Sequence, residues 1–304
     1  RENALITVEL VGSRLQPIAR TIHTYSPTDI LVRRPKVEPA PHRYLHRATD
    51  PDNAIDVVIL GEGYTADEMD SFYTSAQIAA DEILSYEPFC RYADRFNFIA
   101  VESPAPVSGL SIPRLNDWKD TPFESHYSTF YSDRYLTTAN TTPIHEALRG
   151  IPYEHIIILA NTDEYGGGGI YNSYTLTTAR NPMFRPVVVH EFGHSFGGLA
   201  DEYFYESDAL DDSYPIDVEP WEPNITTLVD FDSKWKSLLP EGTPVPTPIE
   251  EKEKHPFGVF EGGGYRFHGI YRPADECRMR NNTYPTFCPA CQAALEELIK
   301  FYID

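Results

Sequence analysis

Two histidines and a glutamate in the 304-residue chain have the residue types and the spacing of a zinc hydrolase site. The segment His190-Glu191-Phe192-Gly193-His194 contains the pattern H-E-x-x-H. Helix positions four residues apart share a face, so both imidazoles can bind one zinc ion. Glu191 is offset around the helix and can take a proton from a water that zinc makes more acidic. The pattern predicts metal-assisted hydrolysis, against the alternative of two core histidines beside a solvated glutamate.

The residues after the pattern supply a break in the helix and a third acidic ligand. Gly197 and Gly198 end the helix, because glycine adopts the positive φ that is common at helix C-termini. An unbroken helix would carry Asp201 ~10 Å beyond the second histidine, so we expect the glycine pair to reverse the chain. Asp201 is the predicted third zinc ligand. Glu202 is expected to point elsewhere, although the sequence leaves the choice between the two carboxylates open.

The elements that must position these residues predict an α+β fold, with a twisted mixed sheet packed on helices. Three continuous apolar runs are typical of buried strands, and longer periodic runs are typical of helices. The expected strands are residues 55–60, 96–101 and 155–161, followed by the β-prone run 174–179, and the expected helices are residues 66–85, the helix that carries the histidines, and residues 289–302.

The first 42 residues are predicted to be a β-rich N-terminal segment with a Pro-rich linker, which could be the remnant of a larger N-terminal domain. Residues 2–12 alternate in polarity like a strand, and β-like runs follow at 18–24 and 30–33. Prolines 35, 39 and 41 then form a stiff, extended stretch. Residues 43–304 are the predicted zinc metallopeptidase catalytic domain.

Four successive glycines, 166–169, precede the β-prone run that leads to the histidine helix. One interpretation is an edge strand on which Gly168, Gly169, Ile170 and Tyr171 bind an extended substrate peptide, the glycines allowing its backbone to come close. The other is a plain hairpin turn. The sequence does not choose between them.

Composition excludes several other classes of protein. The net charge of −21 argues against nucleic-acid binding, which requires a basic surface. No apolar run reaches the length of a membrane helix, so no membrane span is expected. Calcium is conceivable at Asp208, Asp211, Asp212 and Asp217, but the spacing of a calcium loop is absent, and a solvated acidic loop is the better interpretation.

The four cysteines, at positions 90, 277, 288 and 291, are an even number, which permits disulfides without fixing their pairing. Cys288 and Cys291 could also be a redox pair or half a zinc knuckle, but no second C-x-x-C completes the knuckle. We favour a disulfide that joins Cys277 to Cys288 or Cys291 in an exported protein, since the sequence begins at Arg1 without Met.

The chain resembles the IgA-peptidase family of secreted bacterial metalloendopeptidases. The resemblance rests on I-D-V-V-I-L-G-E-G-Y-T, Y-G-G-G-G-I-Y-N, H-E-F-G-H-S-F-G-G-L-A-D-E-Y, C-R-M-R and F-C-P-A-C, which lie between residues 55 and 291. It implies a metzincin-like zinc endopeptidase domain that is secreted, periplasmic or on the cell surface. Met279 is similar to the methionine turn beneath a metzincin zinc. The usual third-ligand position is Ala200 here, so Asp201 reproduces the spacing after Gly198 with a shift of one residue.

The sequence therefore predicts an endopeptidase with one catalytic zinc ion that cleaves a protein or glycoprotein. His190, His194 and Asp201 would hold the metal and Glu191 would be the general base. The alternative is a non-catalytic surface or glycan-binding module with a structural zinc, which Glu191 disfavours because a closed structural site needs no base. A thermolysin-like enzyme is disfavoured because the glycines end the helix so early. The substrate and the oligomeric state are not indicated.

Overall fold

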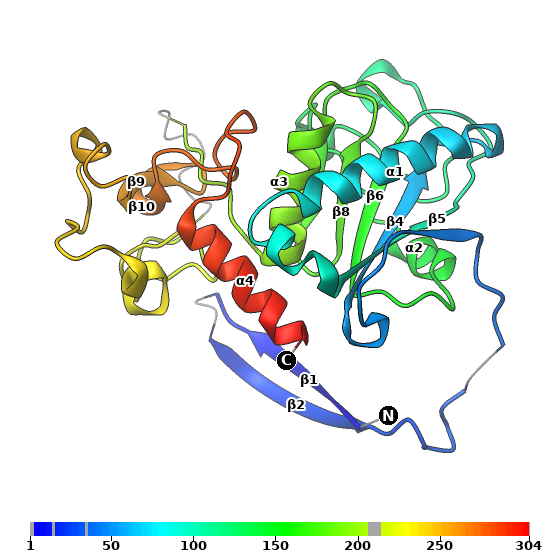
Figure 1. Ribbon diagram of the computed structural model, residues 1–304, viewed down its shortest axis with the longest axis horizontal. Helices are drawn as coiled ribbons and strands as arrows, with labels where there is room; N and C mark the ends of the chain where they lie inside the picture. The colour runs from blue at the N-terminus through cyan, green and yellow to red at the C-terminus, as the bar shows by residue number, and fades with distance from the viewer. Residues whose placement is uncertain (1–2, 14–15, 34–35, 206–213, 304) are drawn as a thin grey trace. The chain divides into compact units, whose positions relative to one another are not determined.

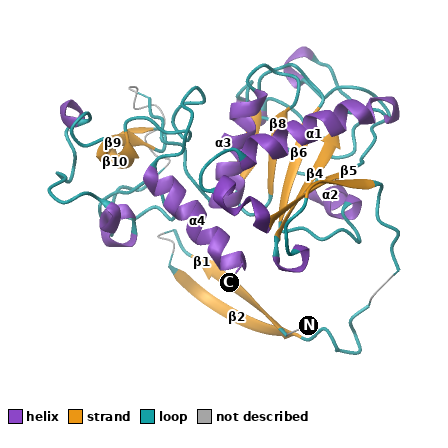
Figure 2. Ribbon diagram, viewed as in Figure 1, coloured by secondary structure: helices purple, strands orange, loops and turns teal. Residues whose placement is uncertain are grey.

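A computed structural model of the chain describes residues 3–13, 16–33, 36–205 and 214–303. The chain divides into two compact units, Arg1–Glu38 and Pro39–Asp304, which are described separately. Helices, strands and loops are shown in Figures 1 and 2. No helix among the described residues is both long enough and apolar enough to span a membrane.

The N-terminal unit is a β-hairpin. Strand β1 (Ala4–Val11) pairs antiparallel with β2 (Pro17–Tyr25). The prediction of a strand at residues 30–33 is wrong, because this segment forms a turn. In the turn, the Asp29 carboxylate accepts a hydrogen bond from the N–H of Leu31 at 2.8 Å. A short side chain that bonds the backbone two residues further on competes with strand pairing, which the apolar letters alone do not reveal.

The second unit is built on a mixed six-stranded sheet, as predicted, with strand order β3-β5-β4-β6-β8-β7. The inner strands run parallel, and the two edge strands, β3 and β7, run antiparallel to their neighbours. The strands are β3 (His42–His46), β4 (Ile55–Glu62), β5 (Phe96–Val101), β6 (His155–Ala160), β7 (Gly167–Ile170) and β8 (Tyr174–Thr178).

Both faces of this sheet are buried, which explains why its central strands are continuous apolar runs. On β4, Val57 and Ile59 face one core cluster and Val58 and Leu60 face the other. The helices α1 (Met69–Leu84), α3 (Phe184–Gly197) and α4 (Pro289–Ile303) contribute to the first cluster, and α2 (Thr141–Ala147) contributes to the second. In Figure 1, α1 and α3 lie together against one face of the sheet.

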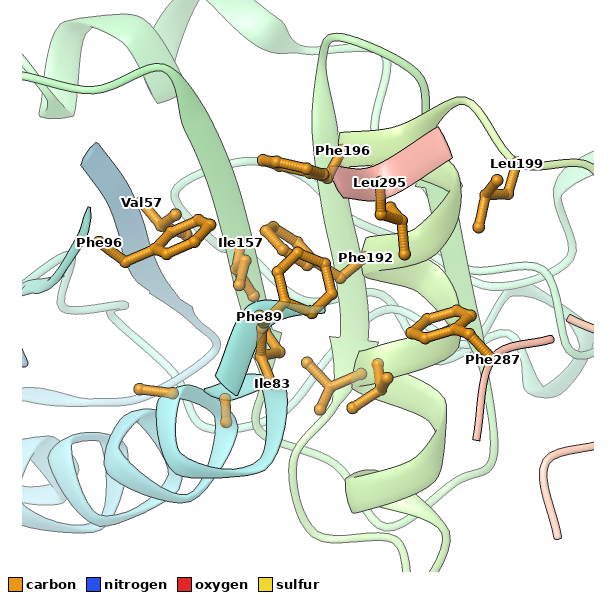
Figure 3. Packing of buried hydrophobic residues seen from close by; sticks show 14 of the residues in the cluster. Val57, Ile83, Phe89, Phe96, Ile157, Phe192, Phe196, Leu199, Phe287 and Leu295 are labelled. Atoms are coloured by element: carbon orange, nitrogen blue, oxygen red, sulfur yellow. The ribbon is translucent and has the colours of Figure 1, made fainter. Parts of the chain in front are cut away.

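Helix α3, which carries the histidines, is enclosed on nearly all sides. Figure 3 shows Phe192 and Phe196 of α3 beside Phe89 and the sheet residue Ile157. The ring centroid of Phe89 lies 5.5 Å from those of both α3 phenylalanines. A helix buried all round has no polar face, so the polar side chains on α3 need specific partners.

The remaining described residues between 203 and 276 form a loop-rich lobe with one hairpin, β9 (Phe257–Gly263) and β10 (Arg266–Ala274) (Figure 2). Strands β3, β9 and β10 and helix α2 were not predicted from the sequence. The lobe also contains the short 3₁₀ helices Phe231–Ser233, Trp235–Leu238 and Ile249–Glu251, and others lie at Pro51–Asn53, Ala66–Glu68, Phe89–Arg95, Pro113–Leu115 and Thr129–Tyr131.

Candidate active site

Helix α3 brings the two histidines together as the sequence predicts. The Nε2 atoms of His190 and His194 are 3.1 Å apart. The helix ends at Gly197, and Gly198 is left-handed with φ 60° and ψ 25°, so the chain reverses at the expected position. After the reversal, Asp201 Oδ1 lies 3.1 Å from His190 Nε2 and 3.4 Å from His194 Nε2.

These three donors fit a zinc ion. Tetrahedral coordination at 2.0–2.1 Å separates neighbouring ligand atoms by about 3.3 Å, close to the three distances between His190, His194 and Asp201. The Nδ1 atom of His190 donates to the carbonyl of Arg278 at 3.0 Å, and that of His194 donates to the carbonyl of Leu199. Because a carbonyl only accepts, each neutral ring directs the lone pair of Nε2 into the site, so the site requires a positive charge.

The pKa shifts of His194 and Asp201 in the metal-free protein also indicate that the site favours a positive charge. Burial opposes protonation of His194, but the Asp201 carboxylate outweighs it and raises the pKa of His194 to about 9. Burial likewise opposes ionisation of Asp201, yet the two histidines hold the pKa of its carboxyl well below the usual range. A proton between these groups supplies the charge that a cation would supply.

Two residues that the sequence analysis missed fix Asp201. Tyr265, in the turn between β9 and β10, donates its hydroxyl hydrogen bond to Asp201 Oδ2. Asn224 clamps the reversed chain, because its side chain accepts from Ala200 N–H at 2.7 Å and donates to the carbonyl of the same residue at 2.9 Å. Both residues lie in the loop-rich lobe, where no periodicity or motif in the sequence predicts their role.

The predicted base, Glu191, lies between the metal-ligand cluster and the edge strand β7. A Cβ on Gly167 would lie 2.7 Å from Glu191 Oε1, so the carboxylate packs directly on the strand. Burial raises the pKa of Glu191, while the two site histidines and the N–H of Gly169 lower it. A carboxyl whose pKa is raised by burial is a better proton acceptor than an exposed one.

The glycine run owes its composition to close packing. A Cβ on Gly169 would lie 2.3 Å from the carbonyl oxygen of Glu191, and one on Gly168 would lie 2.8 Å from that of Leu136. On the outer side of β7, Gly167 already bonds with Arg134 and Leu136. The run is therefore both a hairpin strand, paired with β8, and the edge of the sheet.

A cavity of about 580 Å³ opens over the metal-ligand cluster and Glu191, and the expected substrate-binding residues Gly168, Gly169, Ile170 and Tyr171 line it. Much of the remaining wall is aromatic. The rings of Tyr171 and Trp221 are 4.9 Å apart. Arg134 donates to the hydroxyl of Tyr203 at 3.0 Å. No motif or spacing in the sequence pointed to Arg134 or Trp221. Other aromatic lining residues are Phe130, Tyr135, Tyr165, Phe204, Tyr205, Tyr214 and Tyr265.

Met279 lies buried beneath α3, where a Cβ on Gly193 would be 2.8 Å from its sulfur. Glu202 points away from the histidines, as expected. Its N–H donates to the carbonyl of Met279 at 2.9 Å, and its carboxylate reaches Cys291 Sγ at 3.1 Å. Burial raises the pKa of Glu202 well above its usual value.

The expected disulfide is not formed. Cys277 does lie beside Cys288 and Cys291, as predicted, but all the cysteines are free thiols. The sulfur atoms of Cys277 and Cys291 are 3.8 Å apart, far beyond the ~2.05 Å of a covalent S–S bond. Of the acidic residues weighed for calcium, Asp208, Asp211 and Asp212 lie outside the described residues.

Comparison with known proteins gives one family. The model of the family described as IgA Peptidase M64 matches residues 44–256, which is more than half of the chain and includes the histidine helix and Asp201. No curated protein matches the chain.

Proposed function

The chain belongs to the IgA Peptidase M64 family and is a peptidase, and from that premise we propose that it is a zinc-dependent endopeptidase with its active site at His190, His194 and Asp201. One observation carries the proposal. Three lone-pair donors converge within 3.4 Å, both Nδ1 atoms are committed to carbonyls, and the half-buried carboxylate of Glu191 stands beside them on a cavity.

We propose a metzincin-like arrangement for this site. The helix ends soon after the second histidine, Asp201 returns from the reversed chain as the third ligand, and Met279 lies beneath the helix. The non-catalytic alternative loses its support, because the family is one of peptidases. Three protein ligands leave a coordination position for water or substrate, as a catalytic zinc site requires.

Zinc at this site would lower the pKa of a water molecule and polarise the peptide carbonyl. Glu191 takes a proton at its carboxylate as the water attacks, and then delivers this proton to the leaving amine. The carbonyls of Arg278 and Leu199 hold the two rings so that Nε2 faces inward. Tyr265 positions Asp201 through its hydroxyl hydrogen bond.

The substrate class we propose is a protein or glycoprotein bound along β7. Backbone groups of successive strand residues point to alternate sides. Since Gly167 bonds outward to Arg134 and Leu136, Gly169 also faces outward and can meet an extended peptide beyond the covered stretch. The aromatic pair Tyr171 and Trp221 would then contact substrate side chains or sugar rings.

We also propose that the protein acts outside the cytoplasm, in the periplasm, on the cell surface or in the medium. The support is the family resemblance. The free thiols no longer argue for export, because no disulfide is present. Fractionation of cells that express the full gene tests this point, and recovery of the protein in the cytoplasm alone would contradict it.

The test of the enzymatic proposal uses peptides blocked at both ends, so that only internal bonds can be cleaved. We expect cleavage by the purified protein, loss of cleavage after dialysis against a chelator, and recovery with one equivalent of Zn²⁺. Cleavage that survives complete removal of metal, or that requires a free terminus, would contradict the proposal.

A further inference from the structure

A second group of metal-ligating side chains lies behind the candidate active site. Glu202, Cys277, Cys288 and Cys291 each place one donor atom within 4.8 Å of all the others. These side chains are sealed from solvent, with exposed fractions between 0% and 3%. They come from three separate segments: the reversed chain after α3, the turn that contains Met279, and the start of α4.

The distances within this group, the cysteine–glutamate cluster, fit one tetrahedral zinc ion. Zinc–sulfur bonds of ~2.3 Å separate two thiolates by about 3.8 Å, and Cys277 and Cys291 are 3.8 Å apart. The corresponding sulfur–oxygen separation is about 3.6 Å. The distances from Glu202 Oε1 to Cys291 Sγ and Cys288 Sγ, 3.1 and 3.9 Å, lie on either side of this value.

The second oxygen of Glu202 supports the same conclusion independently. Oε2 is buried and has no hydrogen-bond partner among the described residues, whereas Oε1 accepts a bond from Asn224 at 2.9 Å. An unpartnered buried carboxylate oxygen costs free energy unless a cation or a proton satisfies it. The three thiols are only weak hydrogen-bond donors, so they satisfy this carboxylate poorly.

The surroundings of the cysteine–glutamate cluster are those of ligands that have to carry negative charge. The N–H of Cys288 donates to Cys277 Sγ at 3.2 Å. Cys291 lies in the first turn of α4, where the helix dipole favours anions. The guanidinium of Arg272, 2% exposed, is close enough to attract Glu202 electrostatically. These contacts orient and stabilise the ligands, as outer hydrogen bonds do in metal sites.

We propose that Glu202, Cys277, Cys288 and Cys291 form a second, structural metal site that binds Zn²⁺. Three sulfurs and one carboxylate oxygen suit zinc, whereas calcium and magnesium need six or more oxygen-rich positions. The site is closed, with four protein ligands and no base. It joins the chain segment that presents Asp201 to the segment that presents the carbonyl of Arg278, and so holds the active site from behind without contacting substrate.

The wild-type protein gives the first test, since no variant is needed. Purified without chelator or reductant, it should contain two zinc ions per chain, and a chelator should extract one of them from the folded protein. After denaturation with chelator, an alkylating reagent should modify all four cysteines without reductant. Folded protein that holds no zinc after chelator treatment, or two of the cysteines 277, 288 and 291 that react only after reduction, would overturn the proposal, the second result in favour of a disulfide.

Variants separate the two sites, and with them this proposal from the proposed enzymatic function. His190→Ala should retain one zinc ion and, loaded with Co²⁺, should show thiolate-to-cobalt charge-transfer absorption. Cys288→Ser should lose the second zinc ion, while the matched control Cys90→Ser, at an exposed cysteine, should keep both. If Cys288→Ser does not fold, His190→Ala still decides the matter: no bound zinc and no charge-transfer band would refute the second site.

Discussion

Two adjacent carboxylates, those of Asp201 and Glu202, enter two different groups of metal-ligating side chains. Asp201 meets two histidines at the wall of a cavity, and Glu202 meets three cysteines in a sealed interior. The first group has three ligand atoms and the neighbouring carboxylate of Glu191, the proposed base, whereas the second has four ligand atoms and no proposed base. The comparison shows that a catalytic metal site differs from a structural one in its accessibility and in its number of protein ligands, more than in the presence of a metal ion.

The two groups are also mechanically linked. Cys277, Arg278 and Met279 are consecutive residues, yet the first lies in the cysteine–glutamate cluster, the carbonyl of the second holds His190, and the third packs beneath α3. The sealed group and the open group are therefore joined by a connection of only one or two residues.

The largest effect is expected at Glu191, the proposed base beside His190, His194 and Asp201. Glu191→Gln removes the proton acceptor but keeps the size of the side chain, so turnover of a blocked peptide should fall about 10²- to 10⁴-fold. Zinc content and the unfolding midpoint should stay near wild type, because Glu191 is not among the metal ligands. Near-normal turnover in a zinc-loaded variant would show that the carboxylate is not the base.

The next effect distinguishes the two neighbouring acids. Asp201→Asn should lower active-site zinc affinity and peptide turnover by more than about 100-fold, since even supporting contacts of metal ligands contribute 10- to 100-fold. Glu202→Gln should instead lose the non-exchanging zinc ion and lower stability, with a smaller effect on turnover. Metal analysis and denaturant unfolding measure both. If both variants lose the same zinc ion, Asp201 and Glu202 do not belong to two separate metal sites.

A smaller effect is expected where α3 meets the methionine. The Cβ of Gly193→Ala would lie 2.8 Å from the Met279 sulfur, so we expect overpacking that costs about 1–3 kcal/mol of stability, measured by denaturant unfolding. Gly263→Ala is the matched control, because its nearest neighbours would lie 3.6 Å away. Equal stability of the two variants would mean that the methionine does not buttress the helix.

The smallest effect concerns the hydroxyl that holds Asp201. Tyr265→Phe removes one hydrogen bond to the ligand and should weaken active-site zinc binding about tenfold, as measured by competition with a chelator. Tyr205→Phe is the control, since its hydroxyl bonds with Arg134 at 3.3 Å and contacts no predicted ligand. A loss as large as that of Asp201→Asn would instead make Tyr265 part of the metal site itself.

Much of the fold could be predicted because its central strands are apolar on both faces, so β4, β5 and β6 are evident as continuous runs. The strands β3, β9 and β10 were missed because they have mixed polarity, and pairing partners far away in sequence decide their structure. The turn at residues 30–33 was misassigned for the opposite reason, since its apolar letters outweighed the turn-forming Asp29.

The site was predictable as far as local spacing reaches. His190, His194 and Asp201 lie within twelve residues, so helix geometry and a glycine break suffice to bring them together. The contacts of Asn224 and Tyr265 cross more distant parts of the chain, and no local pattern encodes them. The cysteines were assigned to a disulfide because the fourth donor, Glu202, is remote in sequence from all of them.

The bond from the N–H of Glu202 to the carbonyl of Met279 has a consequence for the loop-rich lobe. It brings the two ends of the lobe together at its base, so that the intervening chain forms a closed loop. Each doubling of the length of a closed loop costs only about 0.6 kcal/mol in chain entropy. Insertions at the surface of the lobe should therefore cost little free energy, so long as Asn224 and Tyr265 keep their contacts with the reversed chain.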